Sequence, residues 1–171
     1  DVCFSFDTLK AKGHPVYRNL LRDVTACEAP SPLAVRYAFK GTELRDLWVG
    51  LTRDAGDVRC VVLTGSGTRA FCAGGDLKER NGMSVDTWQR QHEIFEEAYW
   101  TLMELPVPVI AAVNGHAYAG GLEMALACDF AYAVPGARFA LTEVTIGIMP
   151  GAGGTQNLPR AVGERRAKEI I

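Results

Sequence analysis

Two continuous apolar runs dominate the hydrophobic pattern of this chain, and each ends at a glycine. They read VRCVVLTG at 58–65 and PVIAAVNG at 108–115. Short apolar runs that are rich in β-branched residues and stop at a turn signal are typical of strands buried on both faces of a parallel sheet. Residues 41–53, ahead of the first run, have helical spacing and are followed by a turn. Helix, turn and strand in this order predict an α/β fold.

The other predicted helices also place apolar residues three and four positions apart. Residues 84–104 form the longest of them, with an opening cap at Ser84 or Asp86 and an end at the pair Pro106 and Pro108. His92 lies on the apolar stripe of this helix, and we interpret it as a packed or rim residue. Further helices are expected at about 120–128, within 153–163 and from Glu164 onward, and short strands at 130–134 and 138–141 around a Pro-Gly turn.

Residues 1–36 have the least legible pattern. Leu20, Leu21 and Val24 suggest a short helix, and EAPSP at 28–32 is interpreted as a connector broken by its prolines. We assign no chemistry to this segment.

Composition narrows the class of protein. A chain of 171 residues with 48% hydrophobic and 22% charged residues is typical of one soluble globular domain. The net charge of −2 argues against non-specific nucleic-acid binding, and no apolar run reaches the roughly 20 residues that span a bilayer. The five cysteines and three histidines show no metal-ligand spacing. A reducing compartment is therefore expected, the cytoplasm or, in a eukaryote, the mitochondrial matrix.

Candidate chemistry lies where the apolar runs meet glycine-rich loops. VVLTG leads into AFCAGGD, and VIAAVNG leads into AYAGGLE, where Gly120 and Gly121 open a predicted helix. Small residues let a ligand approach the backbone, and the first N–H groups of a helix point outward unpaired. Two such amides from different strands could bind one oxyanion. Glu123 follows the second loop, and Glu143 precedes another glycine cluster, although carboxylates seldom occupy apolar segments unless they are paired or functional.

Each of these features alone is more often structural than catalytic. A glycine loop after a strand is usually a turn, a glutamate in a first helical turn is often a cap, and Glu143 could be a surface residue at the end of a strand. Other nucleophiles have weaker support: no GxSxG motif occurs, and Cys72 has no identifiable basic partner. The joint occurrence of the loops and acids, in this order, favours a catalytic site.

Three segments give the chain a family resemblance: VVLTGSGTRAFCAGGDLKE, PVIAAVNGHAYAGGLEMALACDF and ARFALTEVTIGIMPGAGGTQNLPRAVG. Together they resemble the crotonase (enoyl-CoA hydratase/isomerase) superfamily over roughly residues 43–171. The resemblance implies a crotonase-like α/β core of stacked ββα units. It also implies two parts: an atypical N-terminal segment at 1–36, and a core at 37–171 that lacks the C-terminal helices with which the family forms trimers and hexamers.

The resemblance also implies catalytic roles for particular residues. The two oxyanion-hole amides of the family fall on Gly75 and Gly120. Its two catalytic glutamates fall on Glu123, which would activate a water, and Glu143, which would protonate Cα. The amide at Gly151 would help to position that water.

An acyl-CoA partner is implied in the same way. Coenzyme A is part of the substrate, and no separate cofactor and no metal are expected. The residues that match the CoA-binding loop of the family are Ala73, Gly74, Asp76 and Leu77.

The retention of both acids favours one reaction, the syn addition of water to a 2-enoyl-CoA to give a 3-hydroxyacyl-CoA in fatty-acid or branched-chain metabolism. Alternatives are another crotonase reaction, such as isomerisation or methylglutaconyl-CoA-type hydration, and a non-catalytic CoA-binding fragment. A homo-trimer or hexamer is the expected assembly, with no nucleic-acid or membrane partner.

Overall fold

A computed structural model describes residues 24–31, 34–39 and 58–171 of the chain. Strands β1 (Val24–Ser31) and β2 (Ala34–Phe39) pair antiparallel in a two-stranded sheet. The predicted connector at 28–32 is therefore wrong over residues 28–31, and Val24 begins a strand instead of continuing a helix. Both strands of such a sheet are edges, where a proline such as Pro30 need not interrupt pairing. The helix expected over 41–53 lies outside the described residues.

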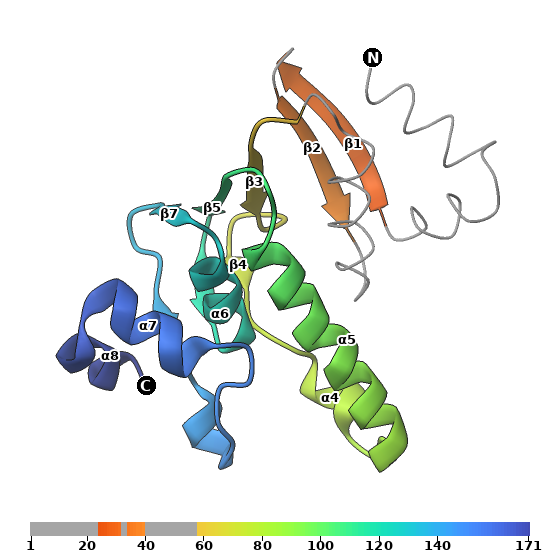
Figure 1. The fold of residues 1–171 in the computed structure, drawn as a ribbon, viewed down its shortest axis with the longest axis vertical. Helices are drawn as coiled ribbons and strands as arrows, with labels where there is room; N and C mark the ends of the chain where they lie inside the picture. The colour runs from red at the N-terminus through yellow and green to blue at the C-terminus, as the bar shows by residue number, and fades with distance from the viewer. Residues whose placement is uncertain (1–23, 32–33, 40–57) are drawn as a thin grey trace.

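Two three-stranded parallel sheets organise the core. The first contains β3 (Val61–Thr64), β5 (Val109–Val113) and β7 (Phe130–Ala133) in that order. The second contains β4 (Ala70–Cys72), β6 (His116–Tyr118) and β8 (Phe139–Ala140). Each pass of the chain forms one strand of the first sheet and then one of the second (Figure 1). The predicted parallel α/β arrangement is confirmed.

Strands β4 and β6 were not predicted, because we interpreted their sequences as loops. Each is only three residues long, too short for its own apolar pattern to be legible. The turn before β6 is instead fixed by Asn114. Its side-chain amide donates to the carbonyl oxygens of Gly65 and Gly67 and accepts from the Gly65 N–H at 3.0 Å. The strands expected at 130–134 and 138–141 exist, but β7 and β8 lie in different sheets.

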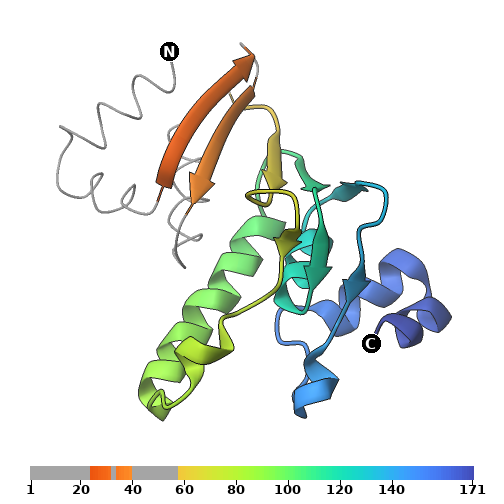
Figure 2. The same cartoon turned by 180° about the vertical axis from the view of Figure 1, so that it is seen from behind.

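The helices agree closely with the sequence pattern. Helix α5 (Val85–Met103) begins at Ser84, whose hydroxyl accepts from the Thr87 N–H. Helix α4 (Leu77–Arg80) is an additional short helix in the segment that was interpreted as a loop. The remaining helices are α6 (Gly120–Ala127), α7 (Gly154–Val162) and α8 (Glu164–Ile170), with a 3-10 helix η1 at Glu143–Ile146. Figure 2 shows α4 and α5 along one side of the sheets and α7 and α8 along the other.

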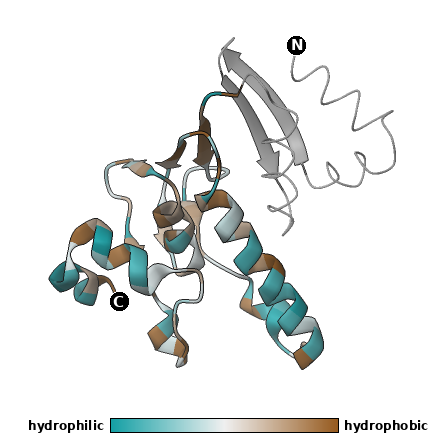
Figure 3. Ribbon diagram, in the orientation of Figure 1, coloured by the Kyte–Doolittle hydropathy of each residue, from teal (hydrophilic) through white to brown (hydrophobic). Residues whose placement is uncertain are grey.

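Helix α6 lies between these flanking helices and is nearly enclosed. Leu122, Ala125 and Ala127 are buried, as are Val109 and Val113 of the neighbouring strand β5. Figure 3 shows β3 and β5 as hydrophobic, whereas much of α5 is hydrophilic. A helix that is apolar nearly all round belongs to a core. The carboxylate of α6 is thereby carried into the interior. No helix in the described part of the chain is long and apolar enough to cross a membrane.

Candidate active site

Glu123 lies in the first turn of α6 with only 2% of its surface exposed. Its Oε1 atom accepts hydrogen bonds from the backbone N–H groups of Ala152 and Gly154, each at 2.8 Å. Gly154 is the first residue of α7, where the helix dipole favours a negative charge. A Cβ atom at this glycine would lie 2.9 Å from the same Oε1. The turn at 152–154 therefore fixes the carboxylate, and only glycine leaves room for it.

Glu143 begins η1 and is 7% exposed. Its Oε2 atom is buried and accepts no hydrogen bond from any described residue. Burial raises the pKa of this carboxyl above its usual range. The nearby Glu123 carboxylate raises this pKa further, while a hydrogen bond from the backbone of Glu143 partly opposes the change. A buried carboxyl with an unpaired oxygen and a raised pKa is characteristic of functional sites.

Tyr99 of α5 connects this region to the start of α6. Its hydroxyl group donates to the backbone carbonyl oxygen of Gly120, and the residue is 4% exposed. Burial is the main cause that raises the pKa of Tyr99, and the charges of Cys72, Glu123 and Glu143 add to it. Tyr99 is therefore a neutral hydrogen-bond donor close to both acids. The sequence placed it only on the apolar stripe of α5, and the signal that could have identified it is that a buried tyrosine hydroxyl needs a partner.

The two glycine loops meet beside these acids. A Cβ atom at Gly74 would lie 3.2 Å from the backbone nitrogen of Gly120, and one at Gly121 would lie 2.0 Å from the carbonyl oxygen of Cys72. The loops after β4 and β6 are thus in backbone contact. Among the described residues, the N–H groups of Gly75 and Gly120 donate to no protein acceptor. No described residue therefore uses either donor.

Ala119 makes the sharp turn that starts α6. It has φ 50° and ψ −129°, and it is the one non-glycine residue with a positive φ in the described part of the chain. Its N–H donates to Ala140 at 2.9 Å, and its carbonyl oxygen accepts from Leu122 and Glu123. Such strained conformations persist where the surroundings over-determine them, and they cluster at functional sites. The turn ends β6 and places Gly120 at the first position of α6.

The residues expected to line CoA lie on the loop that joins β4 to α4. Ala73, Asp76 and Leu77 are exposed, and Gly74 is partly buried. Asp76 has a structural task as well, because its Oδ1 atom accepts from the Lys78 N–H at 2.8 Å and caps α4. CoA binding by these residues stays a prediction.

Gly151, expected to position a water, lies on the exposed part of the turn that holds Glu123. A Cβ atom there would lie 3.7 Å from Cε1 of His92. The His92 ring stacks on Trp88 at 4.9 Å between centroids, and its Nε2 atom lies 3.2 Å from a Glu96 oxygen. The imidazole is therefore half-buried at the edge of the packed region, as expected, and it lies next to Gly151 on the turn that holds Glu123.

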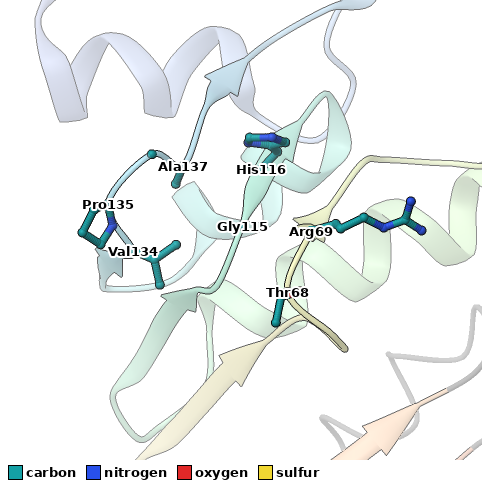
Figure 4. Close-up of a pocket in the computed structure, with 8 residues that line it drawn as sticks. Thr68, Arg69, Gly115, His116, Val134, Pro135 and Ala137 are labelled. Carbon is teal, nitrogen blue, oxygen red and sulfur yellow. The ribbon is translucent and has the colours of Figure 1, made fainter.

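A cavity of about 120 Å³ lies next to Gly75. Arg80, Phe95 and Tyr99 form part of its wall, and sequence reasoning assigned no chemistry to Arg80. A second cavity, of about 290 Å³, includes none of the expected catalytic residues (Figure 4). In that cavity the side chain of Arg69 points away from residues 134–137. The described residues also contain no cluster of His, Cys, Asp or Glu that could hold a metal ion.

Known proteins are similar to this chain in both sequence and fold. The short-chain-enoyl-CoA hydratase of Clostridium acetobutylicum is 41% identical over 126 residues, which are 74% of this chain and 48% of that protein. The mitochondrial methylglutaconyl-CoA hydratase of Homo sapiens is 45% identical over 114 residues, 67% of this chain and 34% of that protein. The chain thus spans a third to a half of the length of these relatives.

The solved structure of an enoyl-CoA hydratase from Bacillus anthracis superposes with a TM-score of 0.78 at 39% identity. The superposition covers 87% of this chain and 62% of the Bacillus anthracis chain. The family model described as enoyl-CoA hydratase/isomerase matches residues 35–171, which include both buried glutamates and both glycine loops. The chain therefore belongs to the enoyl-CoA hydratase/isomerase family and has the crotonase fold.

Proposed function

We propose that the chain is an enoyl-CoA hydratase, which adds water to the double bond of a 2-enoyl-CoA thioester. The observation that supports this most is the pair of buried glutamates: Glu123 is fixed by two N–H donors, and Glu143 has a buried oxygen to which no described residue donates. Two acids in different environments can divide the roles of base and acid. The relatives named as hydratases give independent support.

The oxyanion hole is the first element of the proposed mechanism. The N–H groups of Gly75 and Gly120 donate to the thioester oxygen, and they stabilise the negative charge that develops there when Cβ is attacked. Preorganised donors of this kind contribute about 3–4 kcal/mol each to the barrier reduction in other enzymes. Tyr99 supports the arrangement by holding the carbonyl oxygen of Gly120.

The acids complete the addition. Glu123 accepts a proton from the water through its uncommitted oxygen, while the water oxygen forms a bond to Cβ and the double-bond electrons move to the enolate. Glu143 then gives its proton to Cα, and the thioester carbonyl re-forms. Its raised pKa keeps that proton on the carboxyl at higher pH than an ordinary glutamic acid would. The Gly151 amide, on the turn beside Glu123, would help to orient the water.

A second candidate is the hydration of a branched acyl group, as the name of the human methylglutaconyl-CoA hydratase suggests. Double-bond isomerisation has less support, because moving one proton between two carbons does not need two acids. The preferred acyl group separates the two hydrations from each other. The product separates hydration, which gives a 3-hydroxyacyl-CoA, from isomerisation, which only moves the double bond.

The experiment is a turnover assay on the purified chain with crotonyl-CoA. Loss of the conjugated enoyl absorbance, with formation of 3-hydroxybutyryl-CoA by mass spectrometry, is the expected result. A protein that binds crotonyl-CoA but does not convert it would instead be a CoA-binding module, and the proposed activity would be wrong.

A further inference from the structure

Cys72 ends strand β4 at the place where the two glycine loops meet. A Cβ atom at Gly121 would lie 2.0 Å from the carbonyl oxygen of Cys72 and 2.8 Å from its Cβ atom. Contacts this short leave no space for any side chain at Gly121, so the first turn of α6 packs directly on Cys72.

The thiol of Cys72 also binds the loop that follows β4. Its Sγ atom accepts a hydrogen bond from the Gly74 N–H at 3.5 Å. Gly74 has φ 89°, and a Cβ atom there would lie 3.1 Å from Cβ of Ala119 and 3.2 Å from the backbone nitrogen of Gly120. A side-chain acceptor that binds the N–H group two residues further on holds the backbone in a turn. Because Gly75 follows Gly74 directly, this bond restrains the peptide unit next to the Gly75 amide.

We propose that Cys72 is a positioning residue for the hydration, whose thiol sets the direction of the Gly75 N–H relative to that of Gly120. This rests on the proposed function and deepens it, because both N–H groups must bind one thioester oxygen. Hydrogen bonds weaken steeply when donor and acceptor are misaligned, and preorganised donors of this kind are often the largest contribution to catalysis. The sulfur makes and breaks no bond in the reaction.

The surroundings of the thiol favour positioning over a nucleophilic role. Among the described residues the sulfur accepts from Gly74 and donates to no base, whereas a catalytic thiol needs a base within hydrogen-bond reach. After burial, the charge of Cys72 is the next cause that raises the pKa of Tyr99. The sulfur is therefore near the hydroxyl group that binds the Gly120 carbonyl oxygen. Cys72 thus lies between the groups that hold the two proposed donors.

Three substitutions test this role in crotonyl-CoA hydration. Cys72→Ala keeps the Cβ atom that packs on Gly121 but removes the acceptor. We expect kcat to fall about 3- to 10-fold, the effect of one ordinary hydrogen bond, with little change in KM. Cys72→Ser places a hydroxyl acceptor at the same position and should recover most of this loss. Cys128→Ala removes a buried thiol that ends α6 and is the matched control, for which we expect the wild-type kcat.

A spectroscopic measurement separates positioning from a general loss of packing. Butyryl-CoA has no double bond to hydrate, and a carbon-13 label identifies its thioester carbonyl in infrared difference spectra. The stretching frequency of this carbonyl falls when N–H groups donate to its oxygen. We expect the wild-type chain, Cys72→Ser and Cys128→Ala to lower the frequency by the same amount, and Cys72→Ala to lower it less.

Each outcome decides the question. A Cys72→Ala variant with the wild-type kcat and carbonyl frequency would overturn the proposal. Equal losses in Cys72→Ala and Cys72→Ser would also overturn it, because they would reflect the size of sulfur, and so would an equal effect of Cys128→Ala. If Cys72→Ala does not fold, Cys72→Val, which is close to cysteine in size and has no acceptor, takes its place with the same expected result.

The infrared comparison also keeps this proposal distinct from the proposed function. A wild-type chain that lowers the carbonyl frequency but leaves crotonyl-CoA unchanged would show that the proposed hydration is wrong, and the frequencies of the variants would then decide the role of Cys72 alone. A wild-type chain that hydrates crotonyl-CoA and leaves the butyryl-CoA carbonyl frequency unchanged would overturn the role of Cys72, while the hydration would stand.

Discussion

Glu123 and Glu143 have the same side chain in two different environments. The first is held by two backbone N–H groups at the start of α7, and the second has a buried oxygen without a donor among the described residues. Burial and the neighbouring charge raise the pKa of Glu143. Environments that separate two acids in this way allow one to act as base and the other as acid.

The replacement of either glutamate by glutamine tests this division. We expect Glu123→Gln and Glu143→Gln each to reduce crotonyl-CoA hydration by about 100- to 10,000-fold, because general acid–base catalysis contributes that much. Steady-state kinetics measure the loss, and calorimetric titration with CoA should give an affinity close to that of the wild-type chain. Near-normal turnover in either variant would contradict its proposed role.

The raised pKa of Glu143 also predicts how stability depends on pH. The folded chain binds this proton more tightly than the unfolded chain, so Glu143 stabilises the fold fully below the ordinary glutamic acid pKa, and this contribution is lost as pH rises through the raised value. Glu143→Gln should therefore be more stable than wild type at neutral pH. The difference should vanish toward about pH 4.

Urea unfolding at a series of pH values measures this difference. Glu93→Gln, which removes an exposed carboxylate from α5, is the control for general charge effects. A Glu143→Gln variant that is less stable than wild type at neutral pH, and equally so in acid, would show that burial of the carboxylate has no cost.

Both glutamates and the glycine loops could be found from sequence, because acids and glycines in apolar segments form a visible pattern. The roles of Tyr99 and Cys72 could not. Tyr99 matched the apolar stripe of α5, and its partner is a backbone carbonyl 21 positions away. Cys72 had no identifiable partner in the sequence, and only the folded loop places its sulfur at the Gly74 N–H.

The start of helix α6 is the element on which the site depends. The strained Ala119 sets its direction, Tyr99 binds its first carbonyl, and the close approach of Gly121 to Cys72 presses it onto the β4 loop. These contacts position both the Gly120 amide and the Glu123 side chain. Helix boundaries were predictable from caps and prolines, whereas these contacts between distant segments were not.

Removal of the Tyr99 hydroxyl tests the importance of this helix start. Tyr99→Phe keeps the ring in the core but removes the hydroxyl group that donates to the buried Gly120 carbonyl oxygen. We expect a loss of about 0.5–1.5 kcal/mol in the free energy of unfolding, measured by chemical denaturation. Tyr132→Phe, at a residue that is 71% exposed, is the matched control and should change stability little. Equal effects of the two substitutions would contradict the role of the Tyr99 hydrogen bond.

The whole molecule brings residues from successive passes of the chain to one place. Glu123 follows β6, Glu143 follows β8, and Gly75 follows β4, so three strands of the second sheet lead into the candidate site. The sequence predicted α/β architecture because β3 and β5 are long enough to have an apolar pattern. The second sheet could not be predicted, since its strands are two or three residues long and depend on pairing between distant segments. The expected trimeric or hexameric assembly stays a prediction.

Hydration of crotonyl-CoA in deuterated water tests most directly whether Glu123 and Glu143 act together on one substrate. Because both acids would work from the same side, NMR of the 3-hydroxybutyryl product should reveal one deuterium at Cα, on the same face as the new hydroxyl group. A mixture of faces, addition from opposite faces, or unchanged crotonyl-CoA would contradict a shared site for the two glutamates.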